Sequence, residues 1–124
     1  MTYARVFQSG NSQAVRLPKE FRFDMSVITL GELRHGAEKS QARDKALATL
    51  GRLEGSVRVA PLTETAGQHY GQIRATLETS GPPIGNNDLW IAAHARAEGW
   101  ILITNNERIF KRIEGLQVEN WVNE

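Results

Sequence analysis

The chain has 124 residues, enough for one modest domain, and its 40% hydrophobic and 23% charged residues are typical of a folded globular protein. The formal net charge of +1 excludes a strong overall attraction to nucleic acid, so any nucleic-acid binding requires local basic patches. The lack of cysteine excludes disulfides and thiolate metal sites, and no apolar run approaches the roughly 20 residues that a membrane span needs.

The first 24 residues contain no apolar signal-peptide core, so we expect a cytoplasmic protein. They predict two short extended pieces, at residues 3–7 and 14–17, which turn-forming residues 9–12 connect. Pro18 then starts a helical turn in the position that proline favours. From charge alone, this part of the chain is interpreted as a solvated hairpin.

The middle of the chain alternates between helical and extended patterns. Apolar residues at helical spacing predict one helix that includes residues 30–37 and a second over residues 43–54. Residues 57–59 predict a short edge strand. Thr63 is a suitable N-cap for a third helix, whose apolar stripe leads to Gly81.

The next segment is the most informative. A mostly buried helix is predicted to open at Asn87 or Asp88 and to end at Gly99, which suits a left-handed C-terminal cap. Residues 100–103 are continuously apolar, as in a strand buried on both faces of a parallel sheet. That strand ends in the polar residues 104–106.

A helical turn at residues 106–112 and a strand at residues 116–122 complete the pattern. Strands that alternate with helices predict an α/β domain with a central parallel sheet. Ligands of such sheets bind at the carboxyl ends of the strands. Asp88 and the pair Asn105 and Asn106 are therefore predicted to face one another as half of a metal site.

The motif V-F-Q-S-G-N-S-Q-A-V-R-L-P-K-E-F at residues 6–21 resembles the N-terminal half of the AbrB/MazE-like swapped-hairpin domain of VapB-type antitoxins. That family exchanges hairpins to dimerise and binds DNA. The second hairpin of the family does not follow here. The resemblance implies operator DNA as a partner and these DNA-facing residues: Asn11, Ser12, Gln13 and Arg16, with Arg5 nearby.

Four later motifs resemble the PIN domain of VapC-type toxins: S-V-I-T-L-G-E-L-R-H-G-A-E-K, I-G-N-N-D-L-W-I-A-A-H-A, L-I-T-N-N-E-R-I-F and L-Q-V-E-N-W. This resemblance implies a three-layer α/β fold and an endoribonuclease that depends on Mg²⁺ or Mn²⁺. It also implies that Glu32 is the second acid of the site and Asp88 the third. Asn106, with Asn105 as the alternative, holds the fourth position.

The first acid of the PIN site has no counterpart, because the antitoxin-like segment occupies its place. We therefore interpret residues 1–24 as a VapB/AbrB-like segment and residues 25–124 as a truncated PIN domain that lacks its first strand and helix. The sequence does not distinguish a natural from a designed origin of this chimera. Asp24 is an alternative ligand if residues 3–7 or 21–24 fill the slot of the missing strand.

Each site residue also has a purely structural interpretation. Asp88 is then an N-terminal helix cap, Glu32 an exposed helix acid, and the two asparagines a strand end. The three histidines share no metal-ligand spacing and are predicted to be exposed or half-buried: His35, His69 and His94.

Two functions follow from these patterns. The first is a metal-dependent endoribonuclease whose incomplete site is weakened or inactive. The alternative is a non-catalytic regulator of a toxin–antitoxin system that binds DNA or a partner, and a folded relic is a third reading. Because a missing strand exposes a sheet edge and apolar surface, we also expect a homodimer.

Overall fold

A parallel β-sheet lies at the centre of the fold. The structure is a computed structural model that describes residues 3–5 and 23–120. Within these ranges all strand pairings are parallel and the strand order is β3-β2-β1-β4-β5. The strands are β1 (Tyr3–Arg5), β2 (Phe23–Ser26), β3 (Arg58–Ala60), β4 (Ile101–Ile103) and β5 (Gln117–Glu119). The predicted α/β class with a central parallel sheet is confirmed.

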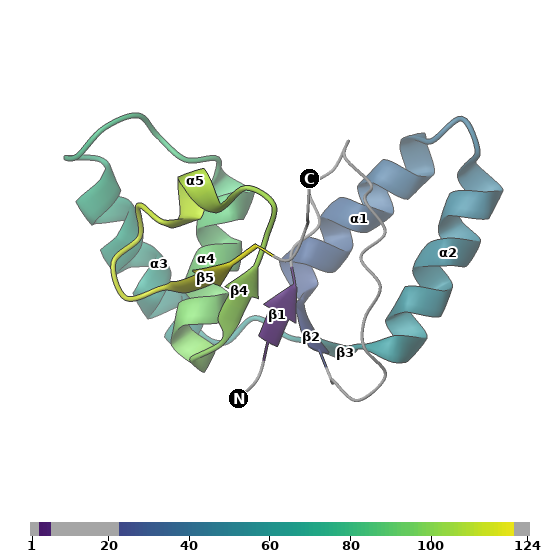
Figure 1. Ribbon diagram of the computed structural model, residues 1–124, viewed down its shortest axis with the longest axis horizontal. Coiled ribbons are helices and arrows are strands. Elements are labelled where there is room, and N and C mark those ends of the chain that lie inside the picture. Colours follow the sequence, from purple (N-terminus) through teal and green to yellow (C-terminus); the bar gives the residue numbers. More distant parts are fainter. Residues whose placement is uncertain (1–2, 6–22, 121–124) are drawn as a thin grey trace.

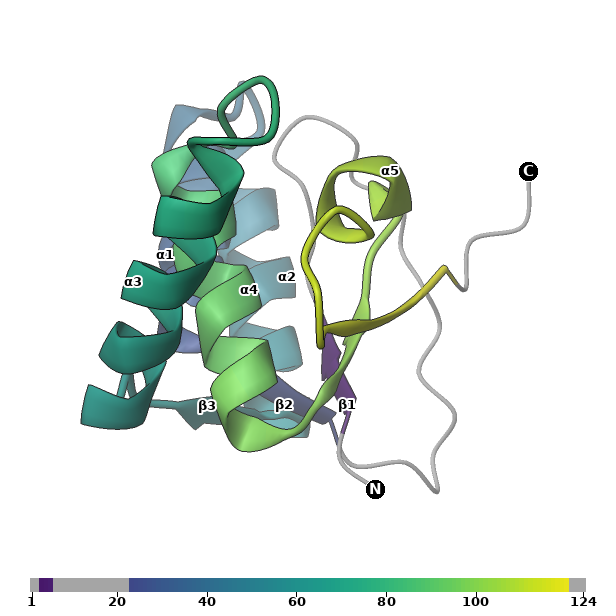
Figure 2. The same cartoon turned by 90° about the vertical axis from the view of Figure 1, so that its left-hand side faces the viewer.

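The helices form two neighbouring pairs, α1 beside α2 and α3 beside α4 (Figure 1 and Figure 2). The first pair lies near β2 and β3, and the second lies near β4 and β5. Among the described residues, no helix is long and apolar enough to cross a membrane. The helices are α1 (Val27–Lys39), α2 (Arg43–Ser56), α3 (Glu64–Leu77), α4 (Asn86–Glu98) and α5 (Glu107–Phe110).

The N-terminal strand β1 occupies the middle of this sheet. Tyr3 lies opposite Phe23 on one side and opposite Ile101 on the other, so β1 pairs with two neighbours. The expectation that a missing strand leaves an open sheet edge is therefore wrong, because residues 3–5 pair with both β2 and β4. The predicted extended piece at residues 14–17 and the helical turn at Pro18 lie outside the described residues.

Local sequence signals at the helix ends are confirmed. The Thr63 side chain accepts a hydrogen bond from the backbone N–H of Ala66 at 3.2 Å and so caps α3. Gly99 ends α4 with a left-handed conformation at φ 70°. Such a conformation has little steric cost for glycine and a larger cost for residues with a Cβ atom.

Helix α4 and strand β4 supply most of the core. Along α4, the stretch from Ile91 to Ala95 is buried at every position, and all of β4 is buried. The predicted mostly buried helix and doubly buried strand are thus confirmed. The aromatic side chains of Trp100 and Phe110 close the core at 5% and 0% exposure.

His94 differs from the sequence-based expectation because it is fully buried within α4. Its ring centroid lies 4.9 Å from that of Trp100. Burial lowers the pKa of His94 below its usual value, although the Glu98 carboxylate and the Pro61 backbone favour the charged form. The expectation of an exposed or half-buried histidine fails here because the ring lies on the core side of a helix that is buried nearly all round.

The buried imidazole predicts a pH-dependent stability. The unfolded chain binds a proton on His94 near pH 6.5, whereas the folded chain resists that proton to lower pH. The free energy of unfolding should therefore fall below about pH 6.5, by at most about 1.4 kcal/mol per pH unit. Urea unfolding at several pH values should show a flatter profile for His94→Asn than for the parent chain, and parallel profiles would contradict the prediction.

Candidate functional site

Two carboxylates from different helices face each other at the carboxyl edge of the sheet. Glu32 is in the second turn of α1, which starts directly after β2. Asp88 is in the first turn of α4. Both side chains are partly buried. The sequence motifs named both residues, and the fold brings them together from 56 positions apart in the chain.

The electrostatic state of the pair reflects this proximity. Partial burial raises the pKa of Glu32 above its usual value, and the negative charge of Asp88 raises it further, while a hydrogen bond with the Asn87 side chain opposes the shift. Burial also raises the pKa of Asp88. The two groups are therefore like charges in a partly desolvated place, which is a favourable location for a cation.

Asp88 is not the N-terminal cap of its helix. Gly85 holds the N-cap position of α4, and no side chain makes a cap hydrogen bond there. Gly85 instead accepts a backbone hydrogen bond from Leu89 at 3.0 Å. The structural interpretation of Asp88 as a cap is thus wrong, and its carboxylate stays available to the site.

A pocket of about 340 Å³ opens beside Glu32. It is lined by Ile28, Gly31, Glu32, His35 and Asn87. Sequence reasoning missed His35 and Asn87 as site residues. The signals were present, since His35 follows Glu32 by one helical turn and Asn87 directly precedes Asp88.

The two asparagines after β4 lie at the same carboxyl edge of the sheet. Asn106 precedes α5, and its backbone N–H donates to the Thr104 hydroxyl at 3.0 Å. The Asn105 side-chain oxygen is buried and makes no hydrogen bond. Both residues sit where the motif predicts a fourth ligand, and the unpaired acceptor is on Asn105.

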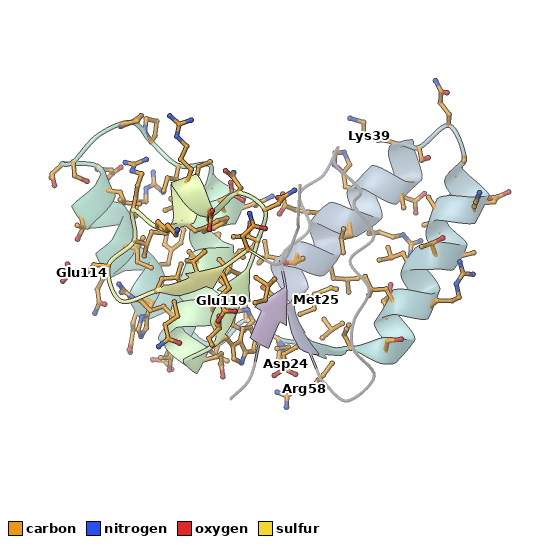
Figure 3. All side chains as sticks on the ribbon, in the orientation of Figure 1. Asp24, Met25, Lys39, Arg58, Glu114 and Glu119 are labelled. Carbon is orange, nitrogen blue, oxygen red and sulfur yellow. The ribbon has the colours of Figure 1, made fainter. Side chains whose placement is uncertain are left out.

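Asp24 lies away from this edge. It is the second residue of β2 and lies opposite Ala4 and Arg58. Figure 3 shows Asp24 beside Arg58 near the amino ends of the strands. Residues 3–7 were one of the two segments expected to take the place of the missing first strand, and β1 (Tyr3–Arg5) does so. This arrangement does not bring Asp24 close to Glu32.

The strand in the central slot supplies no replacement acid in its sequence. Residues 3–5 are Tyr-Ala-Arg, and the five residues that follow are Val-Phe-Gln-Ser-Gly. Among the described residues, no three histidine, aspartate or glutamate side chains are grouped closely enough to hold a metal ion. Among the residues that the structure describes, the two carboxylates that interact at this edge are those of Glu32 and Asp88.

The residues assigned to DNA contact fall mostly beyond the described ranges. Arg5 is the last residue of β1. The other four lie outside the described residues: Asn11, Ser12, Gln13 and Arg16. Their assignment stays a prediction, as does the division of the chain at residues 24 and 25.

The donor set fits a hard divalent cation. Mg²⁺ prefers oxygen ligands, often binds through only one or two protein carboxylates and keeps several waters. Glu32 and Asp88 supply two carboxylates whose repulsion a cation would relieve. The amide oxygen of Asn105 or Asn106 is a further oxygen donor at this edge, but a neutral one.

Comparison with known proteins agrees with the fold. The PIN domain family model matches residues 12–116. The tRNA(fMet)-specific endonuclease VapC of Shigella flexneri is 44% identical over 97 residues, which cover 78% of this chain and 74% of that protein. Ribonuclease VapC2 of Haemophilus influenzae is 42% identical over 98 residues, with 79% and 74% covered.

Solved structures give the same answer. A VapBC-1 structure from nontypeable Haemophilus influenzae matches with a TM-score of 0.84 and 36% identity over 99% of this chain and 100% of that chain. A DNA-bound VapBC structure from Salmonella typhimurium matches with a TM-score of 0.77 and 42% identity, with 81% and 76% covered. The chain therefore belongs to the PIN-domain family, among the VapC-type toxins.

Proposed function

We propose that this chain is a VapC-type endoribonuclease whose site is incomplete and therefore weakened or inactive. The observation that carries the proposal is the charge-coupled pair Glu32 and Asp88 at the carboxyl edge of the sheet. Its relatives support RNA as the substrate, because two of them are a ribonuclease and a tRNA-specific endonuclease. By this proposal the chain acts in the cytoplasm.

Each site residue has a specific role in this proposal. Glu32 and Asp88 would hold a Mg²⁺ or Mn²⁺ ion, and Asn106, or Asn105 in its place, would contribute an oxygen. Such an ion would supply Lewis-acid stabilisation of the negative charge on the scissile phosphate and would activate a water. Asn87 orients Glu32 through their side-chain hydrogen bond. His35 lines the pocket beside Glu32, where it is in a position to contact RNA.

The missing carboxylate explains why we propose a weakened site. Two carboxylates give the site a formal charge of −2, and an amide oxygen adds no charge to it. Since the attraction between a site and a cation scales with their charges, the loss of one carboxylate lowers the affinity directly. Waters complete the coordination of Mg²⁺ in many proteins, so some affinity is compatible with two carboxylates.

The direct test is RNA cleavage with Mg²⁺ and with Mn²⁺, beside an Asp88→Ala variant purified in the same way. We expect weak cleavage that both the substitution and a chelator abolish, because Asp88 is one of two charged ligands. Equal cleavage by both proteins would identify a contaminating nuclease. No cleavage by either protein would contradict a weakened activity, leave only an inactive site, and favour the alternative binding function.

Restoring a carboxylate tests the incompleteness of the site. Val6→Asp adds an acid at the position that follows Arg5 in the sequence, because the resemblance to the PIN domain implies a first acid at the end of the first strand. We expect tighter Mn²⁺ binding in calorimetry and faster cleavage than in the parent chain, because the site gains a negative charge. Val6→Asn is the matched neutral control. Equal binding by the two variants would contradict the interpretation.

The repulsion between the carboxylates also predicts a stability effect. In chelator-treated buffer at pH 7, Glu32→Gln should stabilise the protein by up to about 1 kcal/mol, the usual ceiling for a partly exposed charge pair. A raised pKa in the folded state means that the charged carboxylates oppose folding, and this opposition disappears as the pH falls.

Urea unfolding measures this effect, and Glu38→Gln is the matched control on the same helix. Glu38 forms ion pairs with Arg34 at 2.8 Å and with Arg43 at 2.6 Å, so its neutralisation should bring no gain. If Glu32→Gln is no more stable than Glu38→Gln, the two site carboxylates do not repel each other appreciably.

The alternative function is that of a non-catalytic regulator that binds DNA or a partner protein. It is supported by relatives solved as VapBC complexes, two of them with DNA. By that analogy the partner is an antitoxin, and operator contact uses Arg5, Asn11, Ser12, Gln13 and Arg16. A homodimer is compatible with both functions. Salt-dependent DNA binding that Arg16→Ala abolishes would favour this alternative.

A further inference from the structure

A buried hydrogen bond joins the two helices that carry the site. The Nδ1 atom of His94 in α4 lies 2.8 Å from the hydroxyl oxygen of Ser26, the N-cap residue of α1. Ser26 is 3% exposed and His94 is 0% exposed. The two residues are 68 positions apart in the chain.

Ser26 makes two hydrogen bonds through one oxygen atom. The serine oxygen accepts a hydrogen bond from the backbone N–H of Ile28 at 3.2 Å, which caps α1. The same hydroxyl group shares a hydrogen bond with Nδ1 of His94, and the tautomer of the ring sets which of the two donates. Ser26 thus caps α1 and fastens it to α4 through one oxygen atom.

The position of this bond relates it to the carboxylates. Glu32 follows Ser26 by six residues on α1, and Asp88 precedes His94 by six residues on α4. Six helical residues span about 9 Å along a helix axis. The bond therefore lies about 9 Å from Glu32 along α1 and about 9 Å from Asp88 along α4.

We propose that the Ser26–His94 bond is a positioning device that holds α1 and α4 in the offset at which Glu32 faces Asp88 and Asn87. Apolar packing alone tolerates sliding, because apolar contacts are not directional. A buried hydrogen bond has a narrow range of distance and angle, and its loss leaves a buried polar group unpaired. This inference rests on the proposed function for its purpose, but its geometry is testable separately.

The chain contains no cysteine, so an introduced pair can measure the spacing of the site. Glu32→Cys with Asn87→Cys places one thiol on each helix, since these two side chains meet in the native site. The readout is the rate of disulfide formation with oxidised glutathione, which depends steeply on how closely the two sulfur atoms approach. This measurement requires neither metal nor activity.

Two substitutions at His94 separate the hydrogen bond from the volume of the side chain. His94→Asn keeps a hydrogen-bonding group near the place of Nδ1, whereas His94→Leu keeps bulk and removes that group. We expect the cysteine pair to close at nearly the parent rate with asparagine and about tenfold more slowly with leucine, because disulfide geometry is restrictive. Equal rates with leucine and histidine would overturn the proposal, as would equally slow rates with both substitutions.

Ser26→Gly provides the second variant if His94→Leu does not fold. Glycine is a tolerated N-cap, so this change removes the hydroxyl at little cost to the helix. It should slow closure as leucine does. Leu77→Ala, a buried change in α3, is the control for general loosening and should leave the rate unchanged. A rate that falls equally in this control would overturn the proposal.

A second measurement links the device to the proposed function. Mn²⁺ binding, followed by electron paramagnetic resonance in the cysteine-free chain, should weaken by about tenfold or more in His94→Leu and recover in His94→Asn. Undiminished Mn²⁺ affinity in His94→Leu would overturn the link. If the parent chain binds no Mn²⁺, the proposed metal site fails, while the disulfide rates still decide whether the bond positions the helices.

Discussion

Parallel pairing of β1 with β2 on one side and with β4 on the other is the constraint on which the site depends. Strand β2 leads into α1, which carries Glu32. Helix α4, which carries Asp88, leads into β4. If they were not connected through β1, no sheet would hold α1 and α4 at a defined spacing. Three residues of an N-terminal strand thus join the two parts of the sheet from which the site helices extend.

The pairing of β1 in the sheet and its ability to supply a metal ligand depend on different chemical groups. Parallel pairing uses backbone groups, so a strand of almost any sequence can complete the sheet. Whether the end of that strand contributes a metal ligand depends on its side chains, and none of the five residues after Arg5 is acidic. Backbone pairing can therefore complete the sheet without supplying a carboxylate.

The two carboxylates illustrate a conflict between stability and function. Partial burial and mutual repulsion raise the pKa of Glu32, so the pair opposes folding when it is charged. Glu38 on the same helix avoids this cost, because it forms ion pairs with Arg34 and Arg43. Residues that are unfavourable in the folded protein are typical of sites that bind a ligand.

The sequence by itself predicted the α/β class, the helices, the caps at Thr63 and Gly99 and the family, and its motifs proposed Glu32 and Asp88 as site residues, but it did not predict strand β2. Periodicity and capping are short-range effects, and family motifs name residues without any need for coordinates. Only the tertiary structure decided that β1 fills the central slot, that Asp24 lies at the opposite end of its strand, and that His94 is buried against Ser26. Those facts depend on which distant segments pair and pack, and local sequence carries little information about contacts over 60 residues or more.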